Sequence, residues 1–304
     1  MPAAHDTSAL PRELSDVPGW FPNLDQVLFD WFLTRQESRG VRGDLLEIGV
    51  YMGKSAIFLG HHLRDGEDYT VCDLFEDEAP DGANKAESNK SYPTLTKQVF
   101  ERNYLSFHDA LPRVLRGPSS LVPDEVPPKS CRFVHVDASH LYEHVYGDIG
   151  AARDALLPEG VVVLDDFRSE HTPGVSIAAW EAVLNRGLRP ICLSTQKLYG
   201  TWDDPAPVQE ELLAMVRGRD DCHLSVQEAA GHRIIRVKSK KGMPAPAFPP
   251  SRHHRAPEPA ARTAPQSPAA GSRRPPAASS RARRIAADLL PPVVTRAVRR
   301  GRAR

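Results

Sequence analysis

The chain switches repeatedly between short apolar runs and segments whose apolar residues recur at helical spacing. This alternation predicts strands at 45–48, 69–73, 113–116, 132–136, 161–164 and 190–194, and helices at 54–63, 94–105, 143–157 and 174–186. The run VVVL at 161–164 is almost purely β-branched, which is typical of a strand with both faces buried. Strands that alternate with helices predict an α/β fold, with a mostly parallel, doubly wound sheet and helices on both faces.

The two ends of this pattern differ from its middle. Residues 22–39 carry apolar side chains at helical spacing and predict a lead-in helix that packs against the sheet. Beyond the core, expected strands at 197–202 and 232–237 flank a helix at 208–217, so the far edge of the sheet is expected to be antiparallel. The polar segment 74–93 lacks any such period and is expected to form a loop that covers the site as a lid.

Charge divides the chain into two unlike parts. Residues 241–304 hold 14 Lys and Arg against two acidic residues, which leaves 25 basic and 37 acidic side chains in residues 1–240. The final segment is also rich in Pro, Ala and Ser, a composition that buries too little apolar surface to offset chain entropy. We therefore expect a lead-in region at 1–40, a folded domain at 41–240 and a disordered basic tail at 241–304.

The cysteines and the N-terminus indicate a reducing compartment. Cys72, Cys131, Cys192 and Cys222 lie far apart with no CxxC spacing, which argues against a disulfide framework or a zinc site. The first residues show no charged start followed by an apolar core, so no signal peptide is expected. No apolar run approaches the roughly 18 residues of a membrane span. A cytoplasmic protein is the expectation.

A glycine-rich turn follows the first expected strand. Glu47 ends that strand in the sequence EIGVYMGKS, and Gly49, Gly53 and Ser55 come next. Glycine lets the backbone approach a ligand closely, and amides at a helix start donate hydrogen bonds. A dinucleotide turn would carry GxGxxG, whereas bulky Tyr and Met side chains fill this gap, and the spacing is too short for a phosphate-binding GxxxxGK[ST] loop. The turn predicts a cofactor site but disfavours a dinucleotide.

Acidic side chains end three further expected strands. Asp73 closes the second strand, where a carboxylate can accept hydrogen bonds from both hydroxyls of a ribose, or serve only as a polar strand cap. Asp137 follows the strand at 132–136, and Asp165 and Asp166 follow the next one. Neighbouring strands lie about 4.8 Å apart, so the last three carboxylates can reach one point. Crowded carboxylates repel, and a divalent cation would neutralise them. Alternatively, Asp137 hydrogen-bonds a substrate or a helix start, and Asp166 caps a loop.

The order of these motifs over roughly residues 40–200 resembles that of class I S-adenosylmethionine-dependent methyltransferases, which have a Rossmann-like sheet. In that family ExGxxxG follows the first strand, and an acidic residue ends the second. The resemblance implies contacts to the methionine end and the ribose of the cofactor by Glu47, Gly49, Gly53, Ser55 and Asp73. It also implies adenine contacts after the third strand, where Gly117 and Ser119 match a GxS habit, although a turn without a ligand would explain them equally well.

The second half of the pattern resembles a narrower group, the macrocin-type sugar O-methyltransferases and the cephalosporin-cluster methyltransferase-like proteins. Its members carry D-x-x-H-x-Y-x-x-V-x-x-D followed by a D-D pair. The matching residues here are Asp137, His140, Tyr142, Val145 and Asp148, with Asp165 and Asp166 as the pair. Ala138 and Ser139 stand where a glycine is common, a departure from the pattern. The resemblance implies Mg²⁺ on Asp137, Asp165 and Asp166.

This resemblance implies an O-methyltransferase that acts on a vicinal diol in a sugar or glycosylated natural product. The metal would bind two adjacent hydroxyls and lower the pKa of one of them. A base must also take the hydroxyl proton, and histidine titrates near neutral pH. His171 follows the D-D pair and is the better placed candidate; His140 is the other, unless it orients a ligand or packs in the core. A homo-oligomer is a further expectation.

Two other readings remain open at this point. The same fold could carry nicotinamide chemistry, against which the missing GxGxxG argues. The chain could also be an inactive binding protein with the methyltransferase fold that uses its basic tail on nucleic acid or an anionic membrane, by salt-sensitive attraction that does not depend on sequence.

Overall fold

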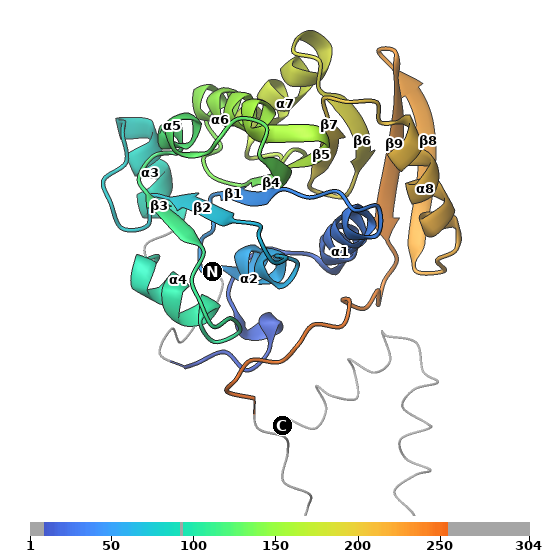
Figure 1. The fold of residues 1–304 in the computed structure, drawn as a ribbon. Helices are drawn as coiled ribbons and strands as arrows, with labels where there is room; N and C mark the ends of the chain where they lie inside the picture. Colours follow the sequence, from blue (N-terminus) through green and yellow to red (C-terminus); the bar gives the residue numbers. More distant parts are fainter. Residues whose placement is uncertain (1–8, 92–93, 255–304) are drawn as a thin grey trace, which may run out of the picture. The chain divides into compact units, whose positions relative to one another are not determined.

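The computed structural model describes residues 9–91 and 94–254. Over these residues the chain forms a nine-stranded sheet in the order β3-β2-β1-β4-β5-β7-β6-β9-β8 (Figure 1). Strands β1 to β5 pair in parallel, and β7 runs antiparallel to both β5 and β6. The strands are β1 (Asp44–Ile48), β2 (Tyr69–Asp73), β3 (Arg113–Arg116), β4 (Cys131–Val136), β5 (Leu156–Leu164), β6 (Arg189–Leu193), β7 (Leu198–Thr201), β8 (Cys222–Ala229) and β9 (His232–Ser239). The expected α/β fold, with a parallel core and an antiparallel far edge, is confirmed.

Helices cover both faces of this sheet (Figure 1). The helices of the described residues are α1 (Asn23–Ser38), α2 (Lys54–His61), α3 (Gly82–Ser91), α4 (Lys97–Tyr104), α5 (Val122–Glu125), α6 (Tyr142–Ala155), α7 (Pro173–Asn185) and α8 (Ala206–Arg217). One apolar cluster joins α1, α2, α4 and α8 to the sheet, and a second joins α6 and α7 to the opposite face. None of the described helices is both long and apolar enough to cross a membrane.

The central strands are buried on both sides because each face contributes to a different cluster. In β1, Leu45 packs with α1 and α2, whereas Leu46 and Ile48 pack with α6 and α7. Each large apolar side chain buried in this way stabilises the fold by about 1.5–3 kcal/mol. The four cysteines are buried as free thiols, in agreement with the absence of CxxC spacing.

Helix α3 and strand β8 are among the elements that were not expected from the sequence. Helix α3 lies inside the polar segment expected to be a loop, and Asp81 caps it by accepting hydrogen bonds from the backbone amides of Ala83 and Asn84, each at 2.9 Å. Strand β8 pairs antiparallel with β9, and most of its residues are exposed. A solvated edge strand lacks the apolar alternation that would have revealed it.

The ordered chain continues beyond the expected boundary at residue 240. Met243 is buried, and the ring of Phe248 stacks on that of Phe58 with the centroids 5.4 Å apart. Further on, Ser251 donates from its backbone amide to the carbonyl of Arg12 at 2.9 Å. Residues 241–254 therefore pack on the domain, while 255–304, the remainder of the expected tail, lie outside the described residues.

Candidate active site

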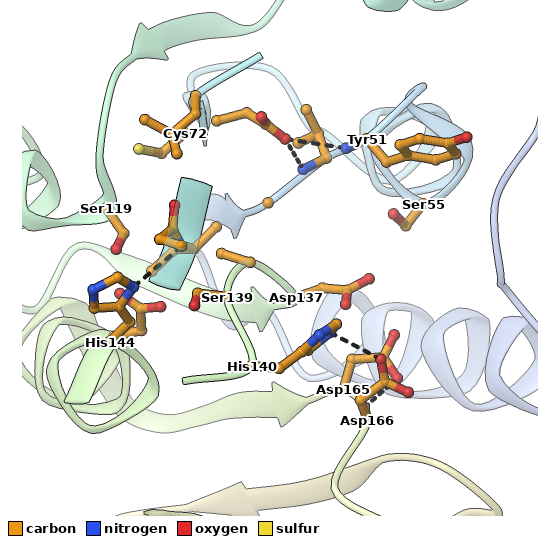
Figure 2. A pocket seen from close by; sticks show the side chains of 18 of the residues that line it. Tyr51, Ser55, Cys72, Ser119, Asp137, Ser139, His140, His144, Asp165 and Asp166 are labelled. Carbon is orange, nitrogen blue, oxygen red and sulfur yellow. Dashed lines mark hydrogen bonds and ion pairs between the residues drawn. The ribbon is translucent and has the colours of Figure 1, made fainter. Parts of the chain in front are cut away.

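A cavity of about 1000 Å³ lies at the carboxyl ends of β1, β2, β4 and β5 (Figure 2). Gly49, Asp73, Asp137 and Asp165, the residues that directly follow or end these strands, all line it. Strands β1 and β4 are neighbours in the sheet, so the connections on their two sides leave in opposite directions along it. In open α/β sheets, ligands bind at such a switch point.

The glycine turn is shaped by the close approach of β4. Gly49 has a φ of +87°, and a Cβ there would lie 2.1 Å from the carbonyl oxygen of Asp137. Only glycine therefore fits between the two strand ends. Tyr51 is also held at positive φ, +47°, and its ring lies at the cavity. The turn brings the backbone to the edge of the cavity, as expected of a cofactor-binding segment.

Asp73 braces this turn from the neighbouring strand. Its carboxylate accepts hydrogen bonds from the backbone amides of Val50 at 2.8 Å and Tyr51 at 3.1 Å, and from that of Phe75 at 2.7 Å. Burial raises the pKa of Asp73, and these three amides oppose the rise. The carboxylate therefore has a structural task in the turn. Oδ2 accepts two of these hydrogen bonds, whereas Oδ1 accepts one and retains a second lone pair for a ligand hydroxyl.

The predicted cofactor residues divide into two groups. The cavity lining includes Gly49, Ser55, Asp73, Gly117 and Ser119. Glu47 and Gly53 do not line it. Gly53, with a φ of +93°, caps the start of α2.

Glu47, which was expected to contact the cofactor, makes contacts inside the protein and does not line the cavity. It is fully buried, accepts a hydrogen bond from the Tyr69 hydroxyl at 2.7 Å, and lies 2.8 Å from Nδ1 of His135. Side chains alternate along a strand, so Glu47 points to the same face as Leu45, under α1 and α2.

Asp137, Asp165 and Asp166 converge at one end of the cavity, as the strand ends predicted (Figure 2). Asp165 is already engaged: its Oδ1 accepts the Asp166 amide at 2.7 Å, and its Oδ2 pairs with the ammonium of Lys197. The Lys197 ammonium also lies 3.4 Å from Nε2 of His135. The carboxylate cluster thus contains a cation supplied by the chain itself.

Lys197 and the carboxylates reduce the unfavourable free energy of burying one another's charges. Burial lowers the pKa of Lys197, and the charge of Asp137 opposes that shift. Burial raises the pKa of Asp137, and Lys197 opposes that shift in turn. The sequence reasoning missed Lys197, which directly precedes β7. Only the antiparallel pairing of Leu164 with Leu198 places it beside Asp165.

Both histidine candidates line the same end of the cavity. Nε2 of His140 lies 3.2 Å from Oδ2 of Asp166, and the Ser169 hydroxyl donates to Oδ1 of Asp166 at 2.7 Å. Burial by itself would raise the pKa of Asp166, but these two hydrogen bonds hold it below its usual value. The His171 ring lies beside that of His140, with the centroids 6.4 Å apart, and its side chain is exposed.

The donor set of this cluster fits a hard divalent cation. Asp137, His140 and Asp166 offer three ligand atoms within 4.8 Å of one another, and so do His135, Asp137 and Asp165. Carboxylate oxygens are the ligands that Mg²⁺ prefers. Asp137 belongs to both groups, whereas Asp165 already faces Lys197. The three predicted aspartates therefore lie close together, but the negative charge of Asp165 is already balanced by Lys197.

The opposite end of the cavity is formed by β2, the segment after β3 and helix α6 (Figure 2). Ser119 donates a hydrogen bond to the carboxylate of Asp148, which is 3% exposed. Nearby, His144 lies 3.3 Å from the side-chain amide of Asn84 and 2.9 Å from the carboxylate of Asp81. Segment 74–93, expected to be a lid, contributes Asn84 and three other lining residues.

Comparisons with known proteins give one family match and several distant structural matches. Residues 46–167 match the family model described as a methyltransferase domain. No curated protein matches the chain. Among solved structures, the O-methyltransferase NovP is 20% identical, with 59% of this chain and 81% of that chain covered and a TM-score of 0.49. CalS11, described as a TDP-rhamnose 3′-O-methyltransferase of calicheamicin biosynthesis, is 20% identical, with coverages of 60% and 80% and a TM-score of 0.41. TomG from Streptomyces achromogenes, solved with S-adenosylmethionine, is 16% identical, with coverages of 72% and 79% and a TM-score of 0.32.

The matched segment runs from β1 to just past β5, and so includes the glycine turn, Asp73 and the carboxylate cluster. This part of the chain is therefore similar to a methyltransferase domain, which supports an enzyme that transfers methyl groups.

Proposed function

We propose that the protein transfers the methyl group of S-adenosylmethionine to a hydroxyl of a vicinal diol, in a sugar or a glycosylated natural product, with the assistance of Mg²⁺. The observation that carries the proposal is one continuous cavity. It joins the glycine turn and Asp73 to the cluster of Asp137, Asp165 and Asp166. The macrocin-type subgroup stays a prediction.

In this proposal the donor spans the cavity from Ser119 towards the carboxylate cluster. The backbone of the turn at Gly49 receives the methionine end, Asp73 receives the ribose hydroxyls, and Gly117 and Ser119 border the adenine. The methyl group then faces the carboxylate cluster. Because methyl transfer is a displacement at carbon, holding donor and acceptor in line supplies much of the acceleration.

The acceptor would lie between the carboxylate cluster and the N-terminal segment. Trp20 lines the cavity, is 72% exposed, and lies 5.7 Å from the ring of Tyr51, so two aromatic faces border the opening. Asp137 and Asp166, with Asp165 beside them, would hold Mg²⁺, which when bound lowers the pKa of an acceptor hydroxyl. His171 takes the hydroxyl proton, and Asp166 orients His140 beside it.

A panel of acceptors tests the reaction and its metal. We expect methyl transfer from labelled S-adenosylmethionine to sugars with adjacent hydroxyls, loss of transfer in chelator, and recovery with added Mg²⁺. Transfer to catechols but not to sugars would contradict the proposed acceptor class. Full activity in chelator would contradict the role of magnesium.

Substitution of the proposed base separates chemistry from binding. His171→Ala should lower kcat by about 10²–10⁴-fold while donor affinity stays unchanged, because general base catalysis acts only on the chemical step. The matched control is His223→Ala, on the exposed strand β8. An unchanged kcat in His171→Ala would assign the proton transfer elsewhere.

A further inference from the structure

Residues 11–22, which we call the N-terminal wall, form one side of the cavity. Gly19 and Trp20 of this wall line the cavity, and the exposed Trp20 ring lies beside that of Tyr51. The wall forms one 3-10 turn, Leu14–Asp16, and is otherwise irregular. A segment with so few hydrogen bonds of its own depends on contacts with the rest of the domain to keep one conformation.

A C-terminal strap, which begins at Met243 and ends at Ser251, contacts this wall at both ends (Figure 1). Asn23, which directly follows the wall, donates a side-chain hydrogen bond to the carbonyl of Met243 at 2.9 Å. At the other end, the Ser251 amide donates to the carbonyl of Arg12 at 2.9 Å, and the Ser251 hydroxyl donates to that of Pro11 at 2.6 Å. The strap therefore runs antiparallel to the wall and ties down its two ends.

Buried contacts make this attachment firm. Ser251 is only 5% exposed, so its hydrogen bonds are shielded from competition by water. The ring of Phe248 stacks on that of Phe58 in α2, and the Phe58 ring contacts Phe21 edge-on with the centroids 5.4 Å apart. Phe21 directly follows Trp20 in the chain. The strap, α2 and the wall therefore pack together next to Trp20.

The strap can affect the ligand only indirectly. Neither Ser251 nor Phe248 lines the cavity, whereas Trp20 does. A wall that is already ordered loses little conformational freedom when a ligand binds against it, and this favours affinity. An effect of the strap on binding must therefore pass through the position of the wall.

We propose that Ser251 is a positioning residue, which orders the N-terminal wall so that Trp20 is held against the cavity before the acceptor binds. The inference rests on the proposed function, because it takes Trp20 to border the acceptor. Affinity for the acceptor then depends on a segment that follows the whole sheet in the chain and lies outside the cavity lining. Affinity for the methyl donor does not depend on it.

Kinetics of single and double variants test this role, with the sugar that the wild-type protein methylates fastest as the acceptor. Ser251→Ala removes the hydrogen bond to Pro11 and should raise the acceptor KM about 5-fold, with kcat and the affinity for S-adenosylhomocysteine changed by less than about 2-fold. Trp20→Ala should raise the same KM about 10-fold, because it removes the aromatic contact itself. In the Trp20→Ala background, Ser251→Ala should raise KM no further, because Ser251 acts through Trp20.

The emission anisotropy of Trp20 reports the order of the wall without any acceptor. It is measured as the difference between proteins that carry Trp20 and the same proteins with Trp20→Phe. Ser251→Ala should lower this anisotropy, whereas Ser251→Thr keeps a hydroxyl and should restore both the anisotropy and the acceptor KM. The matched control is Ser225→Ala on the exposed strand β8, which should behave like the wild-type protein.

Asn23→Ala releases the other end of the wall and should raise the acceptor KM in the same way, which provides the test if Ser251→Ala does not fold. An unchanged acceptor KM in the variant that folds would overturn the inference and leave the proposed function intact. So would a double variant whose KM rises by the product of the two single effects. Failure of the wild-type protein to methylate any sugar would instead contradict the proposed function, and this inference with it.

Discussion

At the scale of single residues, the site is governed by how its buried charges are balanced. Asp165 faces Lys197, Asp166 faces His140, and the charge of Lys197 lowers the pKa of Asp137 against the effect of burial. Several carboxylates persist together in a buried place only when cations or hydrogen bonds offset their desolvation. Lys197 neutralises part of the negative charge of these carboxylates, and a bound divalent cation would neutralise more of it.

Lys197→Met should therefore destabilise the fold by about 3–5 kcal/mol, because it removes one partner of a buried pair and leaves Asp165 without its cation. Urea unfolding of the metal-free protein would measure the loss. Saturating Mg²⁺ should stabilise the variant more than it stabilises the wild-type protein.

The control is Lys238→Met, an exposed lysine on β9, which should change the free energy of unfolding by no more than about 0.5 kcal/mol. The double variant Lys197→Met/Asp165→Asn should lose less than the sum of the two single losses, since the pair acts as a unit. A Lys197→Met protein as stable as the wild type would show that the pair does not balance the cluster.

The sequence predicted the position of those site residues that directly follow consecutive parallel strands. Asp137, Asp165 and Asp166 were predicted to meet because strand ends meet at one sheet edge, and they do. Lys197 was not predicted, since its place depends on the antiparallel return of β7 beside β5. Glu47 was assigned to the cofactor on the resemblance, but strand alternation turns it into the core.

At the scale of elements, the turn between β1 and α2 is the tightest junction of the site. It combines the positive φ of Gly49 and Tyr51 with a backbone that touches β4 and is braced by Asp73. The periodic spacing of apolar residues in the sequence predicted the main helices and strands that pack in the core. Helix α3 and strand β8 have too little apolar periodicity for that approach to detect them.

Gly49→Ala tests this junction. The added methyl would meet the Asp137 carbonyl at 2.1 Å and force a strained φ, so we expect loss of donor affinity. Gly66→Ala is the matched control, because Gly66 also has a positive φ, +78°, but no atom lies within 4 Å of the added Cβ.

The control should cost about 1 kcal/mol of stability, from backbone strain alone. Gly49→Ala should cost a further 1–3 kcal/mol or so for the steric overlap. Thermal unfolding and calorimetry of both variants would measure this difference. Equal losses of stability, with donor affinity retained in both, would contradict the close approach of β4.

At the scale of the whole molecule, one sheet edge brings together residues that are more than 120 positions apart in the chain, from Gly49 to His171. The parallel core places the glycine turn, Asp73 and the carboxylate cluster at neighbouring strand ends, and the antiparallel edge supplies Lys197. Residues 241–254 extend the domain beyond the boundary that composition suggested, because Met243, Phe248 and Ser251 pack on it. Apolar side chains spaced among prolines carry no helical or strand period, so pattern reasoning could not detect this packing.

In the proposed function, the cavity at this edge binds S-adenosylmethionine through the glycine turn and Asp73. Calorimetry of the full chain with S-adenosylhomocysteine should show binding to the wild-type protein and none to Asp73→Ala. Asp109→Ala, which removes an exposed carboxylate that does not line the cavity, should bind like the wild type. Tight binding of a nicotinamide dinucleotide by the wild-type protein, without binding of the adenosyl ligand, would contradict a methyl donor site in this cavity.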